Sequence, residues 1–204
     1  MSVNATFSVT STVQGKSFQV ATPIEADFGG QFDVSCPKAW AGSLTTRTNN
    51  STGTITASNA NHLITTGMLV DLYWGTSNSR RGVTIGTVST TACPLSDSGV
   101  GDVLPIANTN IVMAPVTSIG IGITGNNVLA ITVDPNQNGD GAFSLLDSSA
   151  EVLGQRVTDT DYVWFEGSGV DNPVVNSTLD TLNVSVNDTT AAHVIRGSIM
   201  YDQA

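Results

Sequence analysis

Residues 68–88 read MLVDLYWGTSNSRRGVTIGTV, and this stretch decides how the chain folds. Two apolar, β-branched runs, residues 68–74 and 82–88, flank the polar residues 75–81, which is the pattern of two antiparallel strands joined by a loop. In the first run all residues of one alternating phase are apolar, so that face of the strand is predicted to lie in a core. The members of that face are Met68, Val70, Leu72 and Trp74.

Similar short runs recur from residue 54 to residue 114. They are separated by Gly, Asn and Asp at intervals of about ten residues, which is typical of small antiparallel barrels and sandwiches. Residues 3–13 also alternate with strand periodicity, and only residues 148–155 have the pattern of a helical turn. The sequence therefore predicts an all-β chain, an antiparallel β-sandwich that is jelly-roll-like, with a small β-barrel-like module.

The chain is predicted to divide into three segments with unequal charge. Residues 1–48 form an N-terminal arm and the first strands, residues 49–115 the barrel-like module, and residues 116–204 an acidic C-terminal β-sandwich part. The net charge is −10, and residues 116–204 hold eleven acidic residues against two basic ones. Such a surface repels phosphate backbones and anionic lipid head groups, so neither nucleic acid nor a membrane is an expected partner. An electropositive protein surface suits it better.

Two groups of residues are predicted to lie in an interface with another protein. Arg80 and Arg81 form the only basic doublet, at the tip expected for residues 75–81, where they are either a solvated turn or a contact to an acidic partner. Ile119, Ile121 and Ile123 alternate with small residues, which predicts a face against which another backbone or subunit lies close. Charged residues make up only 12% of the chain, which also suits surfaces that other subunits cover.

The sequence contains no recognisable catalytic constellation, and no catalytic residue or cofactor is predicted. There are two histidines: His62 is expected to be a hydrogen-bonding turn residue, and His193 a structural residue in a strand. Residues 134–141, DPNQNGDG, match the first oxygen ligands of a calcium loop, but Leu145 stands where a bidentate Glu is required. A plain turn is favoured there, and calcium binding is left open.

Cys36 and Cys93 have neither the spacing nor the histidine neighbours of a zinc site, so they are predicted to be two small buried residues. A single disulfide between them is left open. The N-terminus lacks the basic and apolar regions of a signal peptide. The long uncharged span of residues 111–133 contains Pro115 and alternates in hydrophobicity, which predicts a hairpin rather than a membrane helix.

One segment resembles a known class of proteins. Residues 45–56, TTRTNNSTGTIT, lead into residues 61–74, NHLITTGMLVDLYW, and then into residues 82–88, GVTIGTV. This pattern, over about residues 45–113, resembles small β modules of virion structural proteins in tailed bacteriophages, in particular capsid decoration (cement) proteins. The resemblance implies a non-enzymatic head decoration protein on the outside of the capsid, made in the host cytoplasm.

The same resemblance implies two partners, the major capsid protein and further copies of the chain in a homotrimer. Two alternatives remain open from the sequence. One is a tail, neck or baseplate component of the virion. The other is a carbohydrate- or receptor-binding β module.

Overall fold

The computed structural model describes residues 8–10, 17–19, 28–76, 78–96, 99–124, 128–134, 141–146, 152–156, 162–165 and 178–201. These residues form strands and turns, with no helix among them, and the paired strands are antiparallel. The predicted all-β class is confirmed. Within the described ranges, accordingly, no helix is long and apolar enough to cross a membrane.

A curled seven-stranded sheet forms a small barrel. Its strand order is β8-β5-β4-β10-β6-β7-β9. The two sides of the sheet meet where Ile85 bridges Leu95, and Gly86 N donates a hydrogen bond to Pro94 O at 2.7 Å. The strands are β4 (Trp40–Arg47), β5 (Gly53–Ala57), β6 (Leu69–Trp74), β7 (Asn78–Thr84), β8 (Ala92–Pro94), β9 (Val100–Gly101) and β10 (Asn110–Pro115).

The barrel has its own apolar core. Val70, Leu72 and Trp74 of β6 are buried in it, and Met68 packs against it, so the predicted inward face of this strand is confirmed. Leucine and isoleucine side chains from the facing strands fill the remaining space, since a closed barrel of this size is packed by side chains. Those that are fully buried include Leu44, Ile55, Ile85, Leu104 and Ile111.

The remaining large elements are two four-stranded sheets. One has the order β11-β16-β13-β14, and the other has the order β15-β12-β17-β3. Their strands are β3 (Phe28–Cys36), β11 (Thr117–Thr124), β12 (Val128–Asp134), β13 (Gly141–Leu146), β14 (Val152–Arg156), β15 (Tyr162–Phe165), β16 (Thr178–Val186) and β17 (His193–Tyr201).

The order of these eight strands is that of a jelly roll. Along the chain, successive strands change from one sheet to the other, except at the β13–β14 hairpin. Eight antiparallel strands in two such interleaved sheets make the double Greek key that defines this architecture. The sequence prediction of a jelly-roll-like sandwich is therefore confirmed. Described side chains buried in this part include Val34, Val184, Val186, Ile195 and Ile199.

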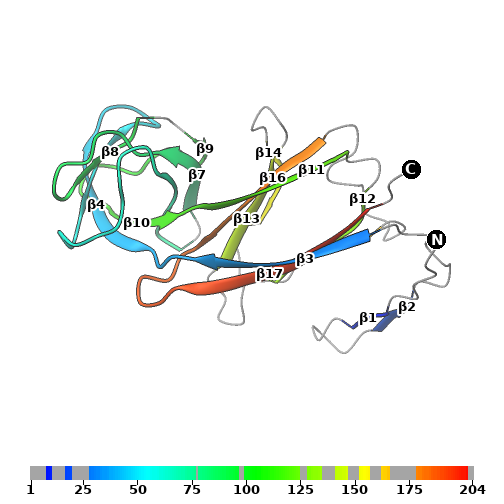
Figure 1. Cartoon of the computed structure of the whole chain (residues 1–204). Coiled ribbons are helices and arrows are strands. Elements are labelled where there is room, and N and C mark those ends of the chain that lie inside the picture. Colours follow the sequence, from blue (N-terminus) through cyan, green and yellow to red (C-terminus); the bar gives the residue numbers. More distant parts are fainter. Residues whose placement is uncertain are drawn as a thin grey trace.

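The barrel is inserted between the first and second strands of the jelly roll, β3 and β11 (Figure 1). The chain enters through residues 37–39, where Ala39 N donates to Asp188 O at 2.7 Å, and it leaves through Val116, whose N donates to Leu69 O at 3.0 Å. The predicted boundary at residues 48 and 49 falls at the turn between β4 and β5. Segment 1–48 thus contributes β3 to the jelly roll and β4 to the barrel.

The N-terminal segment contains a short hairpin. β1 (Ser8–Thr10) pairs with β2 (Ser17–Gln19) in a two-stranded sheet of its own, with Val9 opposite Phe18 (Figure 1). A single hairpin of this kind is marginally stable in water. The rest of the strand predicted over residues 3–13 lies outside the described residues.

Two local predictions were wrong. The second strand of the central hairpin is Asn78–Thr84 rather than residues 82–88, so residues 78–81 belong to a strand and not to a loop. The helical turn expected over residues 148–155 is also wrong in its second half, because Val152–Arg156 is strand β14, paired with β13. Of the candidate calcium loop, residues 135–140 lie outside the described residues.

Candidate functional site

A β-bulge in strand β7 shapes the outer wall of the barrel. Val70 pairs with Val83 and Leu72 pairs with Arg80, so Asp71 on β6 lies opposite two residues, Arg81 and Gly82. Gly82 has a φ of +67°, a conformation that glycine adopts without steric cost. The bulge directs the N–H of Gly82 at Asp71, whose Oδ1 accepts this hydrogen bond at 2.9 Å.

The same bulge pairs Arg81 with Asp71. Arg81 Nε lies 2.8 Å from Asp71 Oδ2, and the two side chains are only 3% and 2% exposed. Burying both charges is costly, and their attraction offsets this cost only when the geometry is good and further hydrogen bonds satisfy the carboxylate. Asp71 meets that condition because both of its oxygens accept hydrogen bonds.

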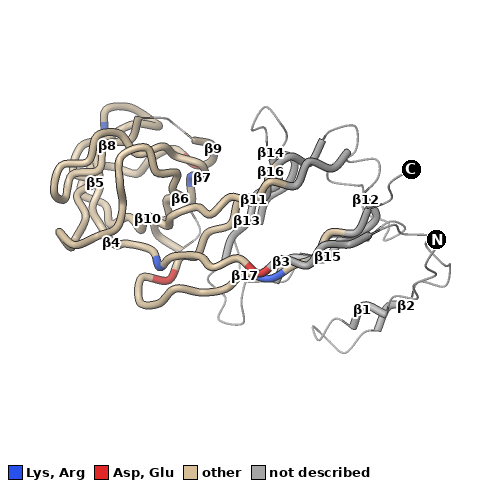
Figure 2. Tube along the Cα trace, in the orientation of Figure 1, with Lys and Arg blue, Asp and Glu red and all other residues tan. Residues whose placement is uncertain are grey.

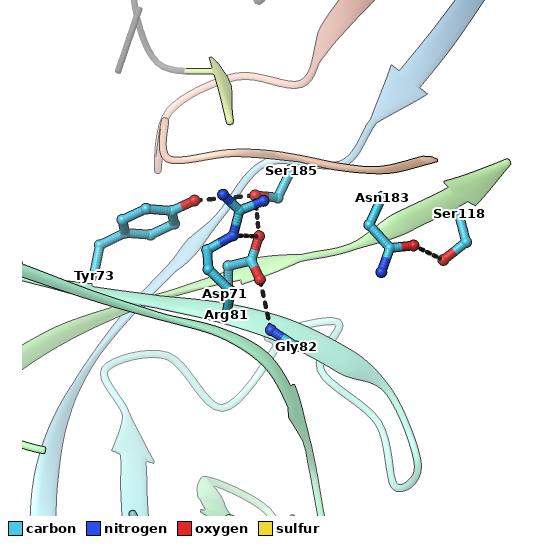
Figure 3. Close-up of polar contacts among 7 residues, drawn as sticks. All are labelled: Asp71, Tyr73, Arg81, Gly82, Ser118, Asn183 and Ser185. Carbon is cyan, nitrogen blue, oxygen red and sulfur yellow. Dashed lines mark hydrogen bonds and ion pairs between the residues drawn. The ribbon is translucent and has the colours of Figure 1, made fainter. Parts of the chain in front are cut away.

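The second donor to the carboxylate comes from the jelly roll. Ser185 on β16 donates from Oγ to Asp71 Oδ2 at 2.6 Å, and Tyr73 OH lies 3.1 Å from the same Ser185 Oγ (Figure 3). A serine hydroxyl has one hydrogen, so Tyr73 donates to Ser185 in this chain of contacts. Burial, and secondarily the Asp71 carboxylate, raise the pKa of Tyr73, which keeps it a protonated donor.

We call Asp71, Tyr73, Arg81 and Ser185 the junction cluster. It connects β6 and β7 of the barrel to β16 of the jelly roll, more than a hundred residues later in the chain. On the same strand, Asn183 is 7% exposed and its Oδ1 accepts a 2.6 Å hydrogen bond from Ser118 Oγ (Figure 3). Asn183 and Ser185 are thus buried polar residues of β16, and Ser185 is the one that contacts the barrel through Asp71 and Tyr73.

Arg80 also acts within the chain. Its Nη1 donates to Asp102 O at 2.9 Å and to Gly101 O at 3.2 Å, and its Nη2 donates to Gly99 O at 3.0 Å. These contacts hold the segment around β9 against β7. The side chains of Arg80 and Arg81 are 8% and 3% exposed, so their prediction as an exposed loop tip was wrong, and we withdraw the inferred contact to an acidic partner. Strand β7 starts at Asn78 rather than at residue 82, and its bulge allows both Arg80 and Arg81 to be buried.

The isoleucines of β11 lie in a different part of the jelly roll. Ile119 is half-buried and pairs with Leu182, beside the fully buried Val184. The side chains of Ile121 and Ile123 lie outside the described part of the structure. The contact of this strand with another subunit therefore stays a prediction.

His62 and the cysteines have structural surroundings. Thr90 O lies 2.9 Å from His62 Nε2, and Ile64 N donates to His62 Nδ1 at 3.2 Å, so the proton resides on Nε2 and the ring stabilises the turn, as predicted. Cys36 and Cys93 are free and buried, which confirms the predicted small buried residues. Burial raises the pKa of the Cys36 thiol to about 12.

Cys36, His193 and Asp188 are the residue types of a nucleophile, a base and an orienting acid. Cys36 pairs with His193 in register, and His193 Nε2 lies 2.6 Å from Asp188 Oδ2. Cys36, however, is 0% exposed and its thiol stays protonated, so no substrate reaches a thiolate there. In the described ranges, no group of three or more His, Cys, Asp or Glu residues is placed to hold a metal ion.

Asp188 organises the loop between β16 and β17. It accepts hydrogen bonds of 2.6 Å from Thr190 N and Thr190 Oγ1, in addition to the contact with His193. These contacts, led by the Thr190 hydroxyl, hold the pKa of Asp188 well below its ordinary value of 3.8. The loop also receives the barrel, because Asp188 O accepts the hydrogen bond from Ala39 N.

We expect Asp188→Asn to remove a pH-dependent part of the stability. A carboxyl with a lowered pKa in the folded state contributes stability above its ordinary pKa, and that contribution is lost as pH falls through the folded value. The difference in free energy of unfolding between wild type and Asp188→Asn should therefore shrink as pH falls below about 4, measured by urea unfolding across pH. A difference that does not change with pH would contradict this assignment.

Comparisons of the chain with protein-family models, curated proteins and solved structures found no match.

Sequence reasoning missed the junction cluster because strand alternation assigns Asp71 to an outward face. One signal was available: Leu69 and Tyr73 share that face, and a strand that is apolar on both faces is covered on both. A carboxylate on such a strand needs a buried partner.

Proposed function

We propose that this chain is a non-enzymatic structural protein of a tailed-bacteriophage virion. Within that class, the function supported best is a head decoration (cement) protein that binds the outside of the capsid and stabilises it as a homo-oligomer. The observation that carries the proposal is the eight-stranded jelly roll with a barrel fastened to it by the buried junction cluster. Jelly rolls are recurrent in viral capsid and lectin domains.

The use of the polar side chains supports an assembly role. Asp71, Arg80, Arg81 and Ser185 all make internal contacts that fix the barrel or join it to the jelly roll. A protein that reinforces a shell must keep its own parts joined, and these buried contacts join the barrel to the jelly roll. The sequence resemblance over about residues 45–113 falls on the inserted barrel.

The acidic part of the chain is complementary in charge to a capsid protein whose outer surface is positively charged. Residues 116–204, which supply seven of the eight jelly-roll strands, hold eleven acidic residues against two basic ones. Complementary charge steers such encounters and gives them a salt dependence. The partner proposed for this surface is the major capsid protein.

The test is binding to emptied, expanded heads that lack this protein. We expect the full chain to co-sediment with such heads, to raise the temperature at which they rupture, and to bind less well as salt concentration rises. Absence of binding at low salt would overturn the proposal. Binding to isolated tails or baseplates instead would favour the alternative virion position.

A carbohydrate- or receptor-binding module is the second candidate, because lectin domains share the jelly-roll architecture. The described tryptophans do not favour it. Trp74 is buried in the barrel core, and Lys38 Nζ lies 4.3 Å from the centre of the Trp40 ring and covers one face of it. Binding to a glycan array without any binding to heads would favour the carbohydrate- or receptor-binding function over the decoration function.

A further inference from the structure

Two of the connections at the end of the barrel remote from the jelly roll are hydrogen-bonded to each other, because Leu104 N donates to Asn50 O. β4 runs away from the jelly roll, from Trp40 to Arg47, and β10 runs back towards it, from Asn110 to Pro115. The β4–β5 turn and the β9–β10 loop therefore lie together at the remote end (Figure 1). We call residues 48–52 and 102–109 the distal end.

Hydrogen bonds fix the β9–β10 loop to β4 and to the β4–β5 turn. Leu104 is 2% exposed in the barrel core, and its N donates to Asn50 O at 2.8 Å. Asn108 N donates to Leu44 O at 2.6 Å, and Thr109 Oγ1 donates to Ile106 O at 2.8 Å. A loop fixed in this way loses little conformational entropy when it binds another surface.

Two large aliphatic side chains point outward from this fixed loop. Val103 is 56% exposed and Ile106 is 76% exposed, whereas Leu104 between them is buried. Apolar side chains held at the surface gain free energy when they are covered, about 25 cal/mol per Å² removed from water. Val103 and Ile106 therefore favour binding of the distal end to a surface that is also apolar.

The distal end belongs to the part of a strongly acidic chain that has no net charge, and its one charged residue, Asp102, accepts a hydrogen bond from Ser79 N at 2.9 Å. Residues 40–115 hold three acidic and three basic residues, so the whole net charge of −10 lies in the rest of the sequence. Asp71, Arg80 and Arg81 are buried, and most of the barrel trace carries no charged residue (Figure 2). Like-charge repulsion between two copies is therefore weakest where barrel meets barrel.

We propose that the distal end is the surface through which copies of this chain associate, with Val103 and Ile106 at its centre. The acidic jelly roll attracts an electropositive partner, and the neutral barrel does not. Two copies of the chain repel each other through their jelly rolls, but no such repulsion acts between their barrels. The occupant of the distal end is thus another copy. This inference rests on the proposed homo-oligomeric function and names its self-association surface.

The size of the patch indicates reversible association. Two aliphatic side chains fall short of the roughly 800 Å² per partner that a stable interface buries. The Ser, Thr and Asn residues of the two connections complete the contact with polar groups. Association is therefore concentration-dependent, and copies bound side by side on a repeating surface gain from their high effective concentration.

The test is sedimentation equilibrium of the full chain over a range of concentrations, at low and at high salt. The wild-type mass should rise with concentration, and more strongly at high salt, because salt screens the repulsion between the acidic parts. Ile106→Glu should weaken association at least about tenfold, since it buries an unpaired charge. Val194→Glu is the matched control: Val194 is 41% exposed on β17 of the jelly roll, and this variant should associate like the wild type.

Three results would overturn the inference. They are a monomeric wild type at every concentration and salt, an Ile106→Glu variant that associates normally, and a Val194→Glu variant weakened as much as Ile106→Glu. Thermal unfolding of each variant verifies that it is folded. Head binding is measured separately. A chain that self-associates without binding heads contradicts the proposed decoration function and leaves the self-association surface intact. A monomer that binds heads contradicts the self-association surface and the homo-oligomeric part of the proposed function, and leaves capsid binding intact.

Discussion

Asp71→Asn is expected to lower the free energy of unfolding by about 3–5 kcal/mol, because it leaves the buried Arg81 guanidinium without its carboxylate. Arg81 is 3% exposed, so water cannot replace the lost partner without opening the junction. For a chain of this length the change corresponds to a fall in Tm of roughly 6–20 °C, measurable by calorimetry. Ser185 and Gly82 also lose an acceptor that carries full charge.

Asp33→Asn is the matched control for this substitution. Asp33 forms an ion pair with Arg196 at 3.4 Å, but both side chains are 66% exposed, so the change should cost about 0–1 kcal/mol. A double variant, Asp71→Asn with Arg81→Met, should be more stable than the sum of the two single effects predicts, because it removes the uncompensated charge. An Asp71→Asn protein within about 1 kcal/mol of wild type would show that the pair does not hold the junction.

The barrel core was predictable because its strands follow local rules. The alternation of Val70, Leu72 and Trp74 specifies which face of β6 is buried, and the structure has that face in the core. The same alternation occurs in β17, where Ile195 and Ile199 lie on one face of the strand and are buried. In both strands, hydrophobicity that alternates with a period of two residues is enough to identify the buried face, because one face of each strand lies in a core.

The junction was not predictable, because its partners are distant in sequence. Ser185 covers Asp71 only once β16 lies against the outside of the barrel, and no local pattern near residue 71 encodes that contact. The bulge at Arg81 and Gly82 adds one residue to β7, which changes the phase of the strand and buries a doublet that reads as a loop. The insertion between β3 and β11 depends on β3 pairing with β17, near the other end of the chain.

Leu44→Ala is expected to destabilise the protein by about 2–5 kcal/mol, because it removes a fully buried side chain and leaves a cavity in the barrel core. Leu63→Ala is the matched control: Leu63 is 65% exposed in the same barrel, and its truncation should change stability by no more than about 0.5 kcal/mol. Urea unfolding of the two variants gives both values. Equal effects would show that the barrel interior is not closely packed.

Leu44 also connects the barrel core to the distal end. Its carbonyl accepts the hydrogen bond from Asn108 N, and its N donates to Thr109 O at 2.9 Å, so the backbone of β4 fixes the loop that carries Ile106. A cavity beneath that strand loosens the loop while leaving Val103 and Ile106 chemically unchanged. We therefore expect Leu44→Ala to weaken self-association as well, and less than Ile106→Glu does, since a pre-organised surface binds more tightly than a mobile one of the same composition.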